Sequence, residues 1–154
     1  MARTSEDITP VDRSIIEQLG EDGRRSYTQI AASLGISEAA VRSRTNRLVE
    51  RGVLQIVGVA DPLKLGYDQM AMIGVHCEGD QLLEAAAAIS ELSEVIYVVV
   101  TAGAFDLLVE VVCVDNEALL DFLATRLRKV PGVVSTETFV YLRIVKQSFQ
   151  WRTA

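Results

Sequence analysis

Apolar side chains recur every three to four residues through the first fifty positions, and this spacing predicts amphipathic helices. Thr9, Pro10 and Asp12 have the form of a helix N-cap, a proline at the first helical position and an acidic capping-box partner. The buried stripe of this first helix is predicted to be Val11, Ile15, Ile16 and Leu19. Glu21-Asp22-Gly23 is predicted to end it.

Two further helices are predicted, joined by a tight turn at Gly35. Ser26 begins the first of them, because Gln29 stands three residues on, where a capping box needs it. Gly35 suits the left-handed residue that follows a helix. Ser37 caps the next helix, whose buried stripe is predicted to be Val41, Thr45 and Leu48, and Gly52 ends it.

The outward face of this last helix has the composition of a surface that reads DNA. At 100° per residue, Ala39, Ser43, Asn46 and Glu50 lie opposite the apolar stripe, with Arg42 and Arg47 on its flanks. Small residues permit close approach, while Asn and Arg donate paired hydrogen bonds to base edges. The pattern favours a helix-turn-helix over the alternative of three ordinary core helices.

The β-rich run from Val53 to Val59 follows, and it predicts the strand of a wing. Residues 1–60 are therefore predicted to form a winged helix-turn-helix domain. Residues 61–66 have the composition of a turn and are predicted to be a linker.

Beyond the linker, the hydrophobic pattern predicts an α+β domain over residues 67–154. Strands are predicted at 70–77, 95–100, 107–114 and 133–145, with helices starting near Leu82 and after Asp115. The order β-α-β-β-α-β is that of a ferredoxin-like fold. The strands are apolar on both sides, and burial of the second sheet face against another copy predicts at least a homodimer.

Charge distribution reconciles an acidic chain with a nucleic-acid partner. The net charge is −6 over 154 residues, and the pI is near 4.8. Between residues 23 and 60, however, six arginines face two glutamates, so positive charge is concentrated around the helix-turn-helix. This small excess predicts that one copy binds DNA weakly and that several copies act together. A polar start and the lack of a long apolar run favour an intracellular protein with no membrane partner.

Cysteine and histidine content indicates no metal or cofactor. His76 is the only histidine, so no coordination set forms around it, and the expected metal ligands are none. Cys77 and Cys113 lie in strand-like contexts and are most simply buried thiols, although the sequence leaves a disulfide between them open. Trp151 is interpreted as a packing or subunit-contact residue.

The chain resembles the Lrp/AsnC family, the feast/famine regulators, over residues 8–149. The resemblance rests on the order and spacing of several short motifs. They are Val11-Asp12-Arg13-Ser14-Ile15-Ile16, Glu21-Asp22-Gly23-Arg24, residues 30–37, Val41-Arg42-Ser43-Arg44, Arg47-Leu48, Gly52-Val53-Leu54, Gly103-Ala104-Phe105-Asp106, Val130-Pro131-Gly132-Val133 and Ser135-Thr136-Glu137-Thr138.

The resemblance implies a transcriptional regulator whose C-terminal domain, called the regulation of amino-acid metabolism (RAM) domain, senses a small effector, most often an amino acid. It also implies homodimers that assemble into octamers on double-stranded DNA, with paired helices reading a pseudo-palindromic operator in the cytoplasm, at the nucleoid. The candidate DNA-binding residues are Arg24, Tyr27, Gln29, Ser37, Glu38, Ala39, Arg42, Ser43, Asn46 and Arg47. Arg44 has two interpretations, a phosphate contact or an ion pair inside the domain.

The resemblance places the effector at the loop that contains Gly103 and Asp106. The candidate effector-binding residues are Thr101, Ala102, Gly103, Ala104, Phe105, Asp106 and Thr136. Asp106 is expected to receive the α-ammonium group, and the alternative is a carboxylate that caps the turn. Ala102 and Ala104 stand where the family often has polar residues, which favours an apolar or aromatic amino acid.

Two alternatives share this fold. One is a tetrapyrrole-decarboxylase-like enzyme with a degenerate DNA-binding half, and the other is a stand-alone amino-acid sensor. A single histidine and a complete recognition helix argue for a regulator with no catalytic residues.

Overall fold

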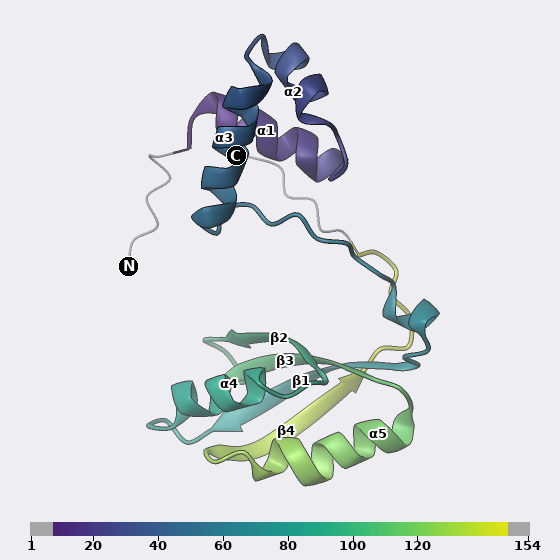
Figure 1. The fold of residues 1–154 in the computed structure, drawn as a ribbon. Helices are drawn as coiled ribbons and strands as arrows, with labels where there is room; N and C mark the ends of the chain where they lie inside the picture. Colours follow the sequence, from purple (N-terminus) through teal and green to yellow (C-terminus); the bar gives the residue numbers. More distant parts are fainter. Residues whose placement is uncertain (1–7, 148–154) are drawn as a thin grey trace. The chain divides into compact units, whose positions relative to one another are not determined.

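The computed structural model describes residues 8–147, which form two compact units (Figure 1). Residues 8–59 with 146–147 belong to the first unit, and residues 60–145 form the second. The predicted linker holds a short 3-10 helix, η2 (Pro62–Leu65), which lies within the second unit. Trp151 lies outside the described residues.

The first unit consists of three helices, and their predicted ends are confirmed. These are α1 (Pro10–Glu21), α2 (Tyr27–Leu34) and α3 (Glu38–Glu50). Reciprocal capping boxes join Thr9 to Asp12 and Ser26 to Gln29. Gly35 has a φ of 66°, a left-handed conformation that lets the chain turn sharply between α2 and α3. The buried residues at the centre of the unit are Ile15, Leu19, Ile30, Ala31 and Val41.

The predicted wing strand does not form. Residues 53–59 belong to no helix or strand, and Val57 and Val59 are 69% and 57% exposed. A strand is stabilised by hydrogen bonds to a neighbouring strand, and the described part of this unit contains only helices. The β-branched residues therefore lack a partner ladder, and a high β-propensity alone does not make a strand.

The second unit is a four-stranded antiparallel sheet in the order β2-β3-β1-β4. The strands are β1 (Gln69–Cys77), β2 (Val95–Val100), β3 (Leu107–Cys113) and β4 (Val133–Val140). Helix α4 (Leu82–Ser90) connects β1 to β2. The second connection runs through α5 (Asn116–Asp121), the π-helix η3 (Phe122–Arg126) and the 3-10 helix η4 (Leu127–Lys129). The predicted β-α-β-β-α-β order is confirmed.

The last strand is shorter than its sequence pattern predicts. It ends at Val140, whereas the apolar pattern continues to Val145. The neighbouring strand β1 begins at Gln69, and the amide of Tyr141 donates to the carbonyl of Met70 at 2.8 Å. Beyond that hydrogen bond, β1 offers no further residues with which the chain could pair. Leu142 and Val145 are therefore 97% and 90% exposed.

One sheet face is covered by α4 and α5, as Figure 1 shows. The hydrophobic core lies between this face and the helices. Alternate residues of the two central strands point into this core, as the two-residue period requires. The buried core residues are Ala71, Ile73, Val75, Ile89, Leu107, Val109, Val111, Cys113, Leu119, Phe122 and Leu127. The other face of the sheet has no covering element among the residues described for this unit.

Candidate nucleic-acid interface

The exposed face of α3 holds the residues predicted to read DNA. Val41, Thr45 and Leu48 are buried against the other helices, which turns the opposite side of α3 outward. The residues of this outer face also line one open concavity along the helix; they are Glu38, Ala39, Arg42, Ser43, Asn46, Arg47 and Glu50. A single surface therefore carries small side chains, an amide and two guanidinium groups, which are the groups that read base edges.

Arg42 is held in place at the start of this surface. Its Nη2 lies 2.9 Å from Oε1 of Glu38, and its guanidinium carbon lies 5.2 Å from the centre of the Tyr27 ring. Thr28 donates a hydrogen bond to the second oxygen of Glu38 at 2.8 Å. Hydrogen bonds from Thr28 and then Arg42 lower the pKa of Glu38. Arg42 thus projects from a small network that joins α2 to α3.

Three predicted contact residues have a structural task in the isolated chain. The hydroxyl of Ser37 accepts from the amide of Ala40 at the start of α3. The side chain of Gln29 accepts from the amide and hydroxyl of Ser26. The backbone of Arg24 donates to Asp22, and its side chain is exposed in the loop before α2.

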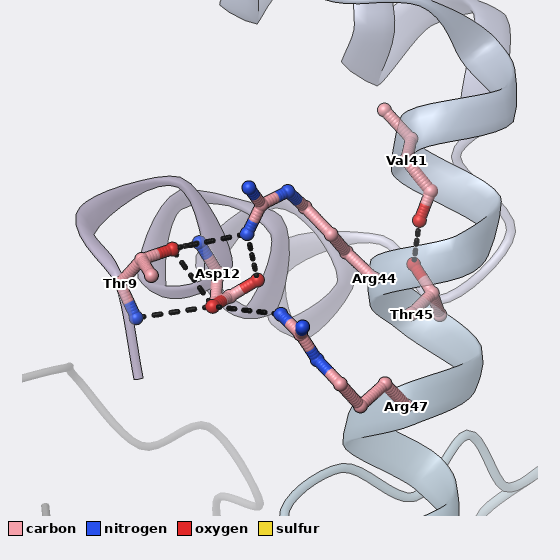
Figure 2. A network of polar contacts seen from close by, with 6 residues as sticks. All are labelled: Thr9, Asp12, Val41, Arg44, Thr45 and Arg47. Carbon is pink, nitrogen blue, oxygen red and sulfur yellow. Dashed lines mark hydrogen bonds and ion pairs between the residues drawn. The ribbon is translucent and has the colours of Figure 1, made fainter. Parts of the chain in front are cut away.

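Asp12 connects the N-terminus of α1 to α3 (Figure 2). Its carboxylate is buried and accepts hydrogen bonds from the amide and hydroxyl of Thr9, at 3.0 and 2.7 Å. Nη1 of Arg44 lies 3.0 Å from Oδ1, and Nη2 of Arg47 lies 3.6 Å from Oδ2. Of the two interpretations of Arg44, the structure therefore shows the ion pair inside the domain.

The pKa of Asp12 reflects two opposed effects. Burial raises it and is the largest single influence, but the hydrogen bonds from Thr9 and the neighbouring guanidinium of Arg44 together outweigh burial. The pKa of Asp12 is therefore lowered. Sequence reasoning identified the capping box and left an ion pair of Arg44 inside the domain open, but it did not identify Asp12 as the partner, because residues 12 and 44 meet only when the helices pack.

Thr45 is polar yet buried, and its geometry explains how α3 tolerates it. Its hydroxyl donates to the carbonyl of Val41, one turn earlier, at 2.9 Å (Figure 2). The hydroxyl is thus satisfied within the helix, and the methyl group is left for packing.

The predicted effector loop closes the hairpin between β2 and β3. The amide of Thr101 donates to the carbonyl of Asp106 at 2.9 Å, and the hydroxyl of Thr101 donates to the carbonyl of Phe105. Ala102, Gly103 and Ala104 form the exposed tip. The loop therefore has an ordered base and an accessible backbone.

Asp106 and Phe105 fasten this loop to β1. Oδ2 of Asp106 accepts from the amide of Cys77 at 2.9 Å, and Nδ1 of His76 lies 3.8 Å from the same oxygen. The Phe105 ring lies over Gly74, where a β-carbon would come within 2.6 Å of its atoms. Asp106 thus anchors the loop to β1 through a backbone amide distant in sequence, and not by capping its own turn, while its side chain remains 45% exposed.

Thr136 does not join the loop within one chain. Thr136 lies on β4 and pairs with Val75 of β1. Paired residues point to the same side of a sheet, so the side chain of Thr136 lies on the helix-covered face, as that of Val75 does. Leu107 of β3 also pairs with Val75. Because neighbouring residues of a strand point to opposite faces, Asp106, which directly precedes Leu107, points to the open face, beside His76. Thr136 accepts a hydrogen bond from Nε of Arg128 at 3.4 Å, and both residues line a separate concavity.

The described residues contain no cluster of three or more metal-ligating side chains. Within residues 8–147, no helix is both long and apolar enough to cross a membrane. Cys77 and Cys113 are free. Cys113 pairs with Gln69, eight residues from Cys77 along β1, so the two lie about 26 Å apart, well beyond the reach of a disulfide. The disulfide that the sequence left open is thereby excluded within one chain.

Comparisons with known proteins match both units. Residues 8–49 match the AsnC-type helix-turn-helix domain, and residues 70–151 match the Lrp/AsnC ligand binding domain. An uncharacterized HTH-type transcriptional regulator of Pyrococcus furiosus is 34% identical, over 92% of this chain and 97% of that protein.

Two solved structures extend the match to the fold. The leucine response regulatory protein of Mycobacterium tuberculosis is 27% identical with a TM-score of 0.86, over 94% of this chain and 99% of that one. A feast or famine regulatory protein from M. tuberculosis, complexed with L-methionine, is 26% identical with a TM-score of 0.85, over 95% of this chain and 99% of that one.

The lowered pKa of Asp12 predicts how stability depends on pH. A carboxyl group with a folded pKa below its unfolded pKa adds stability above the unfolded pKa, and this contribution is lost as pH falls through the folded value. Urea unfolding of the full chain, followed by circular dichroism from neutral to acidic pH, is expected to show this loss. Asp12→Asn should remove that part of the pH dependence. An unchanged profile in the variant would contradict the assignment.

Proposed function

The chain belongs to the Lrp/AsnC family of transcriptional regulators, which bind DNA through a helix-turn-helix, and we propose that it reads its operator with the outer face of α3. The observation that carries the proposal is the single exposed surface on which Arg42, Ser43, Asn46 and Arg47 lie together. Ala39 and Ser43 leave room for base edges, and Asn46 and the two arginines donate to them.

The surrounding residues are proposed to position this helix on the phosphate backbone. Arg24 is exposed in the loop before α2, and Gln29 and Ser37 lie at the N-termini of α2 and α3. Helix N-termini present free amides and a partial positive charge, which suits phosphate. Tyr27 and Glu38 act through Arg42, which they hold.

The acting form is proposed to be a homodimer joined through the open sheet face. This face carries Tyr97 and Phe139, which are 52% and 45% exposed, beside Met72 and Leu108. Tyr141 donates to Glu110 there at 2.9 Å, and burial, followed by this hydrogen bond, raises the pKa of Tyr141 to about 12. An apolar face of this kind is stabilised by a second copy. Two copies also supply the paired helices that a pseudo-palindromic operator requires.

Dimers are proposed to assemble further, into octamers, in keeping with the family resemblance. Such assembly at the nucleoid would combine several weak contacts into tight binding.

The effector is proposed to be an amino acid with an apolar side chain, bound at the loop of residues 101–106. A relative in the family has been solved in complex with L-methionine. The exposed tip of Ala102, Gly103 and Ala104 offers backbone amides to a carboxylate and carries no polar side chain of its own. Asp106 is proposed to anchor the loop with Oδ2 and to receive the α-ammonium group at its exposed edge. Thr136 is proposed to join from another chain, since it lies on the opposite sheet face.

Neither alternative reading is favoured. The matched family consists of transcriptional regulators, and the α3 surface is complete, whereas a decarboxylase or a stand-alone sensor has no need of it.

Replacement of Arg42 or Asn46 by alanine is expected to weaken binding to the selected operator by about 1–3 kcal/mol each, because each removes a paired hydrogen-bond donor. Fluorescence anisotropy with a duplex selected from a random library by the wild-type protein measures this change. Arg143→Ala removes the same charge as Arg42→Ala, outside the proposed interface, and serves as its control. Equal losses in Arg42→Ala and Arg143→Ala, with no loss in Asn46→Ala, would mean that only net charge matters.

Phe139→Glu is expected to shift the protein toward monomer, because the change places a charge within the proposed dimer face. Analytical ultracentrifugation of the full chain measures the distribution. Leu83 is 70% exposed on α4, on the helix-covered side of the sheet, so Leu83→Glu is the matched control and should leave the dimer intact. A Phe139 variant with wild-type association would rule out this face.

Asp106→Asn is expected to weaken the effector response by about 10- to 100-fold, because a charge-assisted hydrogen bond to the ammonium group is lost. DNA binding without effector should stay unchanged. The assay compares binding to the selected duplex with and without each of the twenty amino acids. Asp80→Asn, in the exposed turn before α4, controls for charge. An undiminished response in Asp106→Asn would place the effector elsewhere.

A further inference from the structure

The buried carboxylate of Asp12 holds two arginines of the reading helix, although one would balance its charge. Arg44 and Arg47 are three residues apart on α3, so both reach the N-terminus of α1 (Figure 2). The two contacts are unequal. Arg44 lies 3.0 Å from Asp12, also donates to Thr9 at 3.2 Å, and its side chain is 33% exposed. Arg47 lies at 3.6 Å and is 52% exposed.

Because the two contacts with Asp12 differ in length and exposure, we assign Arg44 and Arg47 different roles. Arg44 neutralises Asp12 and completes the packing of α1 on α3. Arg47 is left as the surplus positive charge, and it also lines the outer concavity of α3 with Asn46 and Ser43. One guanidinium therefore touches a buried anchor and borders the proposed DNA surface.

We propose that Asp12 is a positioning residue for DNA recognition, which acts through Arg47. A long arginine side chain loses rotamer freedom when it binds, and a partner that orders it beforehand reduces that cost. Asp12 suits this role because Thr9 and Arg44 fix its own carboxylate from both sides. A planar guanidinium that contacts Asp12 at one edge keeps further N–H groups for a base or phosphate. The inference rests on the proposed reading surface of α3.

A purely electrostatic role for Asp12 makes the opposite prediction. A carboxylate near DNA repels phosphate, so its removal would strengthen binding to any duplex and steepen the salt dependence. Positioning through Arg47 instead predicts that removal of the carboxylate weakens binding, even though the local charge becomes more positive. The direction of the change therefore separates the two roles.

The test compares Asp12→Asn, Arg47→Gln and the double variant of the full chain, on the duplex selected by the wild-type protein and on a random duplex. Asp22→Asn makes the same charge change at the other end of α1 and is the control. Asp12→Asn is expected to weaken binding to the selected duplex about 3- to 10-fold, the equivalent of ordering one long side chain. It should cause no further loss once Arg47 is glutamine.

Binding by Asp12→Asn that equals or exceeds that of Asp22→Asn, or losses that add in the double variant, would overturn the inference. If Arg47→Gln weakens binding while Asp12→Asn does not, only the positioning role fails. If neither Arg47→Gln nor Arg42→Ala weakens binding, the proposed α3 surface itself is wrong.

A second measurement protects the test against misfolding of the Asp12 variant. Nuclear magnetic resonance relaxation of the arginine Nε–Hε groups in the DNA-free wild-type protein reports their order directly. Arg47 is expected to be more ordered than Arg143, which lies outside the proposed interface. Equal mobility of the two would contradict the positioning role without any substitution.

Discussion

The first unit depends on a buried carboxylate that is fully satisfied. Removing a carboxylate from water costs several kcal/mol, and only good hydrogen bonds and an opposite charge offset that cost. Asp12 has both, because the capping box supplies Thr9 and α3 supplies Arg44 and Arg47. These bonds form together only when α1 crosses α3 in one register. The same contact that stabilises the packing therefore sets which side of α3 faces outward.

In the second unit, the equivalent constraint is the central strand β1. It pairs with β3 on one side and β4 on the other, and it also holds the hairpin loop through Cys77 and Gly74. The Phe105 ring lies over Gly74 on the open face. Its centre is 6.1 Å from the centre of the Phe139 ring. A change in the loop would thus reach the proposed dimer surface through a single aromatic contact. This short path gives a physical basis for coupling between effector and assembly.

The features that sequence predicted well are those set by neighbouring residues. Helix caps at Thr9, Ser26 and Ser37 and the left-handed Gly35 depend on a few consecutive positions, and all are confirmed. The errors concern partners distant in sequence. The run from Val53 to Val59 has the propensity for a strand but no neighbouring strand to pair with. Strand β4 ends at Val140, close to the first residue of its antiparallel partner β1. The choice of Asp12 as the partner of Arg44 and the placement of Thr136 and Asp106 on opposite sheet faces were not predicted either, because they follow from packing and register, which a local pattern does not contain.

Charge in the first unit explains why an acidic regulator can still be selective. Residues 8–59 carry seven arginines and six carboxylates, so the excess is small. The structure pairs many of them internally, since Arg25 contacts Glu21, Arg42 contacts Glu38, and Arg44 and Arg47 share Asp12. A phosphate must compete with these partners, and non-specific attraction is correspondingly weak. Under the proposed function, binding then depends on base contacts and on several copies acting together, so affinity is concentrated at sites that fit both the proposed α3 surface and the spacing of the proposed assembly.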